Sequence, residues 1–320
     1  MHRIAVLTSG GDAPGMNAAL RAIVRYSIYH NIEAFAVQRG FKGLSEGDLK
    51  KMDVSSVGDI IHRGGTIIHS ARCLEFQNDE KIRRKSLQLL KVFNIDGLIV
   101  IGGDGSFKGL QALCELGVNG IGIPGTIDND LPYTEFTIGF DTAVNTAVDA
   151  ISKLRDTASS HERVCIVEVM GRHCGNIALN AGLAGGAESV IVPEMPYDMD
   201  KICQKIIHSN RRGKSQSIIV VAEGVAKTKE LEQIIKEKTH LEVRTAILGH
   251  IQRGGSPSAK DRILATEFGY KAVQLLRKNK SSRVVGINQN QIIDMEIHDA
   301  LNVKRKFDEK MYELANILSI

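Results

Sequence analysis

Short apolar runs alternate along this chain with longer stretches in which apolar residues recur every three or four positions. The short runs are rich in Val and Ile and predict strands. Several are apolar throughout, which is typical of parallel strands that helices cover on both faces. The predicted strands are Ile4–Thr8, Glu33–Val37, Gly97–Ile101, Gly120–Ile123, Arg163–Val169, Val190–Val192, Ser217–Ala222, Val243–Leu248 and Arg283–Ile287.

The stretches between these runs have the spacing of amphipathic helices. One apolar stripe contains Leu20, Ile23, Val24 and Ile28, and a longer one contains Phe140, Ala143, Val144, Ala147, Val148, Ile151 and Leu154. Strands that alternate with helices predict an α/β protein with mainly parallel sheets, which binds ligands at the carboxyl ends of its strands. No linker or repeat marks a domain boundary, and the break that the pattern favours lies near residues 137–140.

Composition and charge narrow the picture. The 320 residues are 43% hydrophobic and 24% charged, and the formal charge of +4 suits binding of anionic metabolites but is weak evidence for nucleic acid. No apolar run approaches the roughly 20 residues that cross a bilayer, and the first residues lack the layout of a signal peptide. The scattered cysteines, without a C-x-x-C pair, fit reduced thiols. We therefore expect a cytoplasmic protein with neither a membrane nor a nucleic acid as partner.

Glycines surround a carboxylate where the strand ending at Ile101 meets the next helix. The turn reads Gly102-Gly103-Asp104-Gly105-Ser106. Glycines let the backbone approach a phosphate, and a helix N-terminus offers free N–H groups to an anion. Because Asp104 would repel a bare phosphate, a bridging Mg²⁺ makes most sense of this arrangement. The alternative is a tight turn in which Asp104 only caps the helix.

Two other strand ends carry candidate chemistry. Thr8-Ser9-Gly10-Gly11-Asp12 could hold a nucleotide phosphate, although it is neither a Rossmann G-x-G-x-x-G nor a P-loop. Pro124-Gly125-Thr126-Ile127-Asp128-Asn129-Asp130 places two carboxylates on one loop, where one can accept a proton from a hydroxyl and the other can support a metal. Taken alone, this loop is better interpreted as a solvated Asx turn.

Cations follow the later strands. Arg172, in the turn Met170–Gly175, can form paired hydrogen bonds with a phosphate or stabilise charge during phosphoryl transfer. Arg244 and the stretch His250–Gly255 add further basic groups. Arg21 and Arg25 share one helix face, and residues 211–214 form a basic run. These last two are solvated faces or, if they converge, a second anion site.

Together these motifs resemble those of the bacterial ATP-dependent 6-phosphofructokinases. The matching stretches occur in the family's order over essentially the whole chain, and they are Leu7–Asp12, Gly102–Ser106, Pro124–Asp130, Met170–Arg172 and Gly249–Gly255. The resemblance implies two Rossmann-like three-layer α/β/α domains of similar size. Residues 1–138 plus 256–304 would bind ATP, and residues 139–255 plus 305–320 would bind fructose 6-phosphate and contact other subunits.

The resemblance also implies an activity: transfer of a phosphoryl group from Mg-ATP to the C1 hydroxyl of D-fructose 6-phosphate, the committed step of glycolysis. Asp128 would be the base, and Asp104 would bind Mg²⁺. Gly105 and Gly125 leave room for ATP, whereas pyrophosphate-using relatives carry Asp and Lys there. The implied catalytic residues are Asp128, Thr126, Arg172, Asp130 and Arg72. The implied ATP-binding residues are Gly11, Arg72, Cys73, Gly102, Gly103, Asp104, Gly105 and Ser106.

Arg163 and Arg244 would reach the sugar phosphate from a neighbouring subunit, so a homotetramer would share its active sites across a subunit interface. The implied substrate-binding residues are Thr126, Ile127, Asp128, Arg163, Met170, Gly171, Arg172, Glu223, Arg244, His250, Ile251, Gln252 and Arg253.

An effector site for ADP or GDP and for phosphoenolpyruvate would lie between subunits. The implied effector-binding residues are Arg21, Ala22, Ile23, Val24, Arg25, Arg155, Gly186, Ala187, Glu188, Arg212, Lys214, Ser215 and Gln216. Val54 stands where some relatives have Arg, and Gln216 stands where His is common. Because each change removes a positive charge, we expect a present but weaker response to anionic effectors.

Three alternatives account for fewer of these residues. A lipid or NAD kinase shares the Gly-Gly-Asp-Gly turn but lacks the Asp128/Asp130 loop and the His250–Arg253 loop. A pyrophosphate-dependent enzyme is disfavoured by Gly105 and Gly125. A non-catalytic sensor would have lost Asp128 or Asp104, and both are present.

Overall fold

The computed structural model describes residues 1–71 and 73–319, and the chain divides into two compact units. Unit 1 comprises Met1–Thr142 and Arg253–Arg305, and unit 2 comprises Ala143–Gln252 and Lys306–Ile320. Each unit has its own sheet, of seven strands in unit 1 and four in unit 2. The predicted α/β fold with mainly parallel sheets is confirmed. The assignment of a ligand to each predicted domain stays a prediction.

The sheet of unit 1 has the strand order β11-β10-β5-β4-β1-β2-β3. Its strands are β1 (Arg3–Thr8), β2 (Glu33–Val37), β3 (Leu49–Met52), β4 (Gly97–Gly102), β5 (Gly120–Pro124), β10 (Arg283–Asn288) and β11 (Gln291–Glu296). The pairings from β2 through β1, β4 and β5 to β10 are parallel, and the two edge strands β3 and β11 are antiparallel. The carboxyl ends of β1, β4 and β5 therefore lie side by side.

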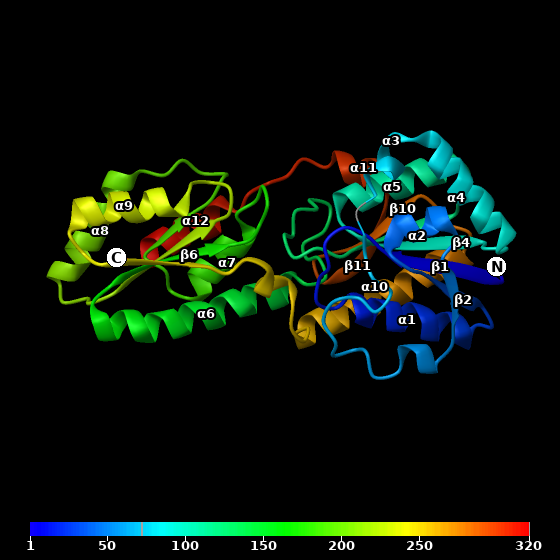
Figure 1. The fold of residues 1–320 in the computed structure, drawn as a ribbon, viewed down its shortest axis with the longest axis horizontal. Helices are drawn as coiled ribbons and strands as arrows, with labels where there is room; N and C mark the ends of the chain where they lie inside the picture. Colours follow the sequence, from blue (N-terminus) through cyan, green and yellow to red (C-terminus); the bar gives the residue numbers. More distant parts are fainter. Residues whose placement is uncertain (72, 320) are drawn as a thin grey trace. The chain divides into compact units, whose positions relative to one another are not determined.

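Helices cover both faces of this sheet. Figure 1 shows α1 (Met16–Tyr29) and α10 (Ala259–Arg277) on one face and α4 (Glu80–Val92), α5 (Asp104–Glu115) and α11 (Ile297–Asn302) on the other. Phe107 and Leu110 of α5 pack with Leu7 and Val100 of the central strands, all fully buried. This burial of apolar side chains stabilises the packing of α5 on the central strands. The shorter helices of unit 1 are α2 (Gly40–Glu46), η1 (Ser55–Val57) and α3 (Leu74–Asn78).

Unit 2 is built on a sheet with the order β7-β8-β6-β9, in which all pairings are parallel. Its strands are β6 (Val164–Val169), β7 (Ser189–Ile191), β8 (Ser217–Ala222) and β9 (Val243–Ile247). Ile191 packs with α8 (Met199–Arg211) and α9 (Thr228–Thr239), whereas its neighbour Val190 faces α7 (Asn176–Ala184). Because successive strand residues point to opposite faces, helices cover both sides of this sheet as well. α12 (Glu309–Leu318) also belongs to unit 2, and η2 (Gly249–Arg253) ends at the first residue of the second segment of unit 1.

The helix α6 (Phe140–His161) begins in unit 1 and continues into unit 2, because the division falls between Thr142 and Ala143. The apolar stripe predicted from the sequence lies along it, and Ala143, Ala147 and Ile151 are fully buried. The start of α6 lies inside the range 137–140 that the pattern favours for a break, and the division between the units falls just after it.

The hydrophobic pattern did not predict β3 and β11. β3 contains two adjacent lysines, Lys50 and Lys51, and β11 reads Gln-Ile-Ile-Asp-Met-Glu. Each is an antiparallel edge strand that pairs with one neighbour only. Such strands carry polar residues on their open side and lack the uniform apolar character of the buried parallel strands.

Within the part of the chain that the structure describes, no helix is both long enough and apolar enough to cross a membrane.

Candidate active site

The order of the strands brings three of the predicted turns to one edge of the sheet in unit 1. β4 pairs with β1 on one side and with β5 on the other, and both pairings are parallel. The hydrogen bond from Ser9 N to Ile101 O (2.9 Å) continues the first pairing beyond β1, and that from Gly125 N to Gly102 O (3.0 Å) continues the second. The turns that follow the three strands are therefore neighbours.

The turn after β1 lies against an arginine from the far end of the sequence. A Cβ atom added to Gly11 would lie 1.7 Å from Nη1 of Arg253, so the guanidinium fills the space that a side chain would need. Nε of Arg253 is buried and has no hydrogen-bond partner among the described residues. The structure thus brings together a residue predicted for ATP and one predicted for the sugar phosphate. This pair presents a backbone and a cation to an anionic ligand.

The turn after β4 leads directly into α5. An added Cβ at Gly102 would lie 2.4 Å from Ser106 Oγ and 2.6 Å from the backbone oxygen of Ser9, so only glycine fits at that position. Asp104 is the first residue of α5 and receives a hydrogen bond from Lys108 Nζ (2.7 Å) one turn later. Ser106 N and Phe107 N donate to Gly103 O (3.0 and 3.1 Å), so an anion at this helix start would bind to the N–H groups of Asp104 and Gly105.

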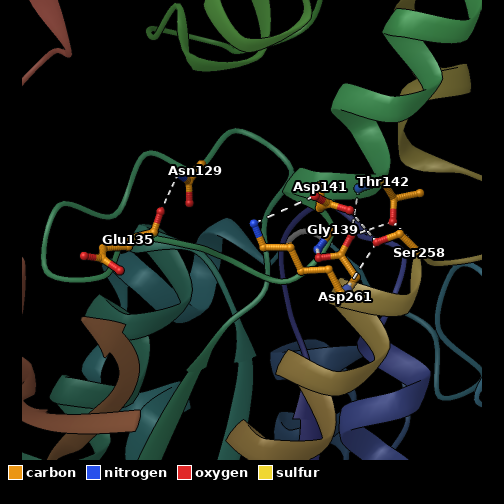
Figure 2. Close-up of polar contacts among 8 residues, drawn as sticks. Asn129, Glu135, Gly139, Asp141, Thr142, Ser258 and Asp261 are labelled. Atoms are coloured by element: carbon orange, nitrogen blue, oxygen red, sulfur yellow. Dashed lines mark hydrogen bonds and ion pairs between the residues drawn. The ribbon is translucent and has the colours of Figure 1, made fainter. Parts of the chain in front are cut away.

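The loop after β5 buries its first carboxylate. Asp128 is 6% exposed, and its backbone N–H donates to Thr126 Oγ1 (3.2 Å). Asn129 has a φ of 51°, a left-handed conformation that Asn tolerates better than most residues, and its side-chain amide donates to Glu135 O (3.0 Å, Figure 2). The loop is therefore closed on itself, which holds the Asp128 carboxylate at a defined position.

In unit 2 the predicted turn after β6 is supported from two sides. Glu223 accepts hydrogen bonds from the backbone N–H groups of Gly171 (3.3 Å) and Arg172 (2.7 Å), and Gln252 Oε1 accepts one from Met170 N (2.8 Å). Gln252 is fully buried, whereas the side chain of Arg172 is exposed. Glu223 and Gln252, predicted as substrate ligands, thus position the backbone that carries Arg172.

His250 and Ile251 are exposed on η2, and the division between the units falls between Gln252 and Arg253. The motif Gly249–Gly255 therefore belongs partly to each unit. Ile127 is buried beside Asp128, at 1% exposure, so its side chain contributes to the core rather than to a surface.

Arg163 and Arg244 are at the other end of the sheet in unit 2. Arg163 directly precedes β6, and Arg244 lies in β9 beside Cys165. Both pair with Glu242: Arg163 Nε is 2.6 Å from Oε2, and Arg244 Nη2 is 2.5 Å from Oε1. The hydrogen bond from Arg163 is the main cause that lowers the pKa of Glu242.

A strand advances about 3.3 Å per residue, so the six residues of β6 put about 20 Å between this arginine pair and the Met170–Arg172 turn of the same chain. Arg163 and Arg244 therefore do not join that turn within one subunit. Their contribution from a neighbouring subunit stays a prediction, and their placement here is what that prediction requires.

The predicted effector residues form separate groups in the two units. On α1, Arg25 is exposed and Arg21 half-buried, whereas Ala22, Ile23 and Val24 are buried. Any ligand contact from this segment would thus come from the arginines.

In unit 2 a second group converges around Arg155. Its guanidinium donates to Gly185 O (2.6 Å), Gly186 O (2.7 Å) and Gln216 Oε1 (3.3 Å). Lys214 forms an ion pair with Glu188, which is 1% exposed. Ala187 is buried, Arg212 is exposed and Ser215 is half-buried.

Of the remaining predictions, Arg72 lies outside the described residues. Cys73 is half-buried, with Sγ 4.0 Å from Glu75 Oε2. Asp130 is half-buried on the loop that carries Asp128. The sequence analysis did not identify Lys108, which pairs with Asp104, or Glu242, which pairs with Arg163 and Arg244. Lys108 follows Asp104 by four residues on a helix, and this spacing was a signal that could have identified it.

The family described as phosphofructokinase matches residues 3–276 of this sequence. This match covers most of the chain, and the chain belongs to the phosphofructokinase family. The resemblance inferred from the motifs is therefore confirmed.

Individual relatives agree with this assignment. An ATP-dependent 6-phosphofructokinase 1 from Clostridium perfringens is 59% identical over 319 residues, which cover 100% of both chains. An ATP-dependent 6-phosphofructokinase from Clostridium botulinum (strain Loch Maree) is 58% identical over the same length, again covering 100% of both.

Solved structures share the fold. Phosphofructokinase from Saccharomyces cerevisiae superposes with a TM-score of 0.89 at 34% identity; the match covers 99% of this chain and 46% of the yeast chain. A pyrophosphate-dependent phosphofructokinase from Marinobacter aquaeolei gives a TM-score of 0.88 at 22% identity, covering 97% of this chain and 86% of that chain. The second likeness concerns the fold alone.

Proposed function

We propose that this chain is an ATP-dependent 6-phosphofructokinase. It transfers the γ-phosphoryl group of ATP to the C1 hydroxyl of D-fructose 6-phosphate and yields fructose 1,6-bisphosphate and ADP, the committed step of glycolysis. The observation that carries this proposal is the edge of the sheet in unit 1 at which the turns after β1, β4 and β5 lie side by side. Full-length relatives with that activity in their names, at 59% and 58% identity, support it.

The buried carboxylate of Asp128 acts as the base. It accepts the proton of the C1 hydroxyl while the oxygen of that group forms a bond to the γ-phosphorus and the bond from this phosphorus to the β,γ-bridging oxygen breaks. A base within hydrogen-bond reach contributes about 10²–10⁴-fold to such a reaction. The closed loop around Asn129 holds Asp128 for this step.

The remaining catalytic effect comes from alignment and from neutralised charge. Thr126 and Arg172 stabilise the moving phosphoryl group, and Asp130 assists beside Asp128. Gly11, Cys73 and the Gly102–Ser106 turn hold ATP, together with Arg72. Met170, Gly171, His250, Ile251 and Arg253 hold the sugar phosphate, with Glu223 and Gln252 behind the Met170–Arg172 backbone.

Mg²⁺ is the expected cofactor, and Asp104 is the residue that would hold it. Proteins bind Mg²⁺ through one or two carboxylates together with substrate phosphates and water. Asp104 fits this requirement, because it is a partly exposed carboxylate at the N-terminus of α5, although Lys108 now pairs with it. When bound, the ion neutralises charge on the phosphates.

The enzyme works as a cytoplasmic homotetramer in which Arg163 and Arg244 of one subunit complete the site of the next. ADP or GDP and phosphoenolpyruvate act at a separate site that combines Arg21 and Arg25 with the group around Arg155. The placement of Arg163 and Arg244 away from the Met170–Arg172 turn supports this arrangement.

The test is the initial rate as a function of fructose 6-phosphate concentration, with MgATP as donor and ADP formation as readout. The same series with pyrophosphate in place of ATP identifies the donor. We expect turnover with MgATP and little with pyrophosphate. Absence of turnover with MgATP, or a preference for pyrophosphate, would overturn the proposal.

A further inference from the structure

One buried carboxylate that accepts several hydrogen bonds belongs to a residue that none of the motifs contains. Asp261 lies in the first turn of α10 and is 1% exposed. Its Oδ1 accepts a hydrogen bond from Gly139 N (2.9 Å), and its Oδ2 accepts from both the backbone N–H (2.8 Å) and the hydroxyl of Thr142 (Figure 2). A carboxylate is costly to bury unless such donors satisfy it.

These donors belong to the beginning of α6, where the residue before the helix has no side chain, for a steric reason. The residue directly before this helix is Gly139, which has a φ of 99°. A Cβ added there would lie 2.7 Å from Ala13 Cβ, so a capping Ser, Thr, Asp or Asn cannot occupy the position. Asp261 supplies the missing acceptor from a helix more than a hundred residues later in the sequence.

Residues at the start of α6 in turn hold the start of α10. Ser258 caps α10 by accepting from Asp261 N (3.2 Å), and its hydroxyl donates to Asp141 Oδ2 (2.7 Å, Figure 2). Ser258 N also donates to Thr142 Oγ1 (3.0 Å). The two helix starts therefore hold each other, and neither can shift without breaking several hydrogen bonds.

From Gly139 the connection to the predicted catalytic loop is short. Thr137 Oγ1 donates to Thr126 O (2.6 Å), and Ile138 N donates to Pro124 O (3.0 Å). Residues 137–139 thus run beside the beginning of the loop that carries Thr126 and Asp128. A shift of Gly139 would be transmitted to both.

The turn after β1 packs on the same group. A Cβ added to Gly15 would lie 2.6 Å from Ile138 Cγ2 and 3.5 Å from Asp261 O. Asp261 therefore lies close to Gly15 and, through Gly139 and residues 137–138, is linked to the start of the Thr126–Asp130 loop. These are the two segments whose spacing sets the distance between nucleotide and base in the proposed reaction.

We propose that Asp261 is a positioning residue for phosphoryl transfer: as a remote cap of α6, it holds the Thr126–Asp130 loop in register with the turn after β1. This role rests on the proposed function, but its structural part, the ordering of the loop, does not. The reacting groups must be aligned to within about 1 Å, and a misplacement of that size can lower the rate about 10²-fold.

Four variants of the full-length chain test this role. Asp261→Asn keeps the shape of the side chain, but its NH₂ group faces an N–H or O–H donor from which Asp261 accepts a hydrogen bond. Thr142→Val removes the hydroxyl that bridges Asp261 and Ser258, and Thr142→Ser keeps it. Asp96→Asn is the control for the loss of a backbone-bound carboxylate elsewhere: Asp96 is exposed and also accepts from two backbone N–H groups, those of His2 and Arg3, at the amino ends of β1 and β4.

The chain contains no tryptophan, so a single Trp can report on the loop. Phe136 is half-buried, with Lys260 Nζ 3.4 Å from its ring centroid, and Phe136→Trp places the probe between Asn129 and Gly139. Acrylamide quenching of this Trp measures how well the loop is packed. All four variants are made with and without the reporter.

We expect kcat to fall about 10²-fold in Asp261→Asn and about 10-fold in Thr142→Val, with a smaller change in KM for ATP, and with stronger quenching of the reporter in both. Thr142→Ser should restore near wild-type values. Asp96→Asn should leave kcat and quenching unchanged even where it lowers the thermal midpoint. If Asp261→Asn does not fold, the comparison of Thr142→Val with Thr142→Ser tests the proposal.

The proposal is overturned if Asp261→Asn and Thr142→Val lose only thermal stability and keep kcat and quenching like Asp96→Asn. Failure of the proposed function can be distinguished from failure of the role of Asp261. If the wild-type chain has no turnover with MgATP, the proposed function fails, and quenching alone then decides whether Asp261 orders the loop.

Discussion

Asp128 combines burial with a fixed backbone. It is 6% exposed, and the loop around it is closed by the hydrogen bond from Asn129 to Glu135 O and by that from Thr137 to Thr126 O. Gly102, at the end of the neighbouring strand β4, leaves no room for a side chain because of the Ser9 backbone oxygen. At the scale of residues, the backbone around Asp128 is therefore held by hydrogen bonds, and the position of Gly102 requires glycine.

Replacing the base should separate catalysis from binding. In Asp128→Ser the hydroxyl cannot accept the proton at neutral pH, so we expect kcat to fall about 10²–10⁴-fold while ATP still binds. Steady-state rates and calorimetric titration with ATP measure the two effects. Asp149→Ser, an equivalent change at an exposed position of α6, is the control. Retained turnover would remove Asp128 from its role.

Two adjacent glycines should differ sharply in their tolerance of alanine. A Cβ at Gly102 would lie 2.6 Å from the backbone oxygen of Ser9, whereas one at Gly103 would meet only Thr126, at 3.8 Å. Gly103 also has an ordinary φ of −98°. We expect Gly102→Ala to lower the free energy of unfolding by about 1–3 kcal/mol and Gly103→Ala to lower it much less. Urea denaturation compares them, and equal losses would contradict the packing described here.

At the scale of elements, the parallel strands of unit 1 place the turns, and contacts between helix starts and sheet edges hold those turns. α10 takes part twice, through Asp261 at its first turn and through Lys271 farther along. Lys271 Nζ is 3.1 Å from Asp294 Oδ1, and Arg283 also pairs with Asp294. This ties the antiparallel strand β11 to the helix and to β10.

The stability of the sheet edge formed by β11 should depend on pH through Asp294. Burial acts to raise the pKa of Asp294, but hydrogen bonds from Lys271 and Arg283 outweigh it, and the pKa is lowered. The carboxylate therefore stabilises the fold fully above the pKa of an unfolded Asp, and this contribution is lost as the pH falls through the lowered value.

We expect Asp294→Asn to lower the free energy of unfolding at pH 7 by about 1–3 kcal/mol, and the difference from wild type to shrink below about pH 4. Denaturation curves at several pH values measure it. Asp299→Asn, at an exposed position of α11, is the control. A difference that stays constant down to pH 3 would exclude this ion pair as its source.

At the scale of the whole molecule, the proposed regulation would depend on the cations that each chain offers to an effector. Arg155 donates to Gln216 Oε1, and Glu188 pairs with Lys214, so two cations of the predicted effector group already have partners in one subunit. Val54 is 47% exposed and carries no charge where some relatives have Arg. An anionic effector thus meets fewer available cations than the family pattern would offer.

We expect phosphoenolpyruvate to shift the half-saturating concentration of fructose 6-phosphate only slightly to the right. Each restored cation should strengthen the effector's hold by about 1 kcal/mol or more. Rate curves with and without phosphoenolpyruvate, for the wild type and for Val54→Arg combined with Gln216→His, measure this. A larger shift in the double variant is expected, and strong inhibition of the wild type would contradict the argument.

The pattern of apolar residues was sufficient for the central strands, because buried parallel strands are apolar throughout and need no partner to be recognised. The predicted Ile4–Thr8, Gly97–Ile101 and Gly120–Ile123 strands correspond to β1, β4 and β5. The apolar pattern did not predict β3 and β11, whose more polar sequences form strands by pairing with β2 and β10.

The candidate site divides in the same way. Turn chemistry and motif order identified Gly11, Asp104 and Asp128, since glycines and carboxylates at strand ends are local signals in the sequence. Asp261 has no such signal, because its role depends on Gly139 and Thr142, which are 122 and 119 positions away. Local sequence determined which residues could act, and the tertiary structure decided which distant side chains hold them, because contacts between remote segments form only when the chain has folded.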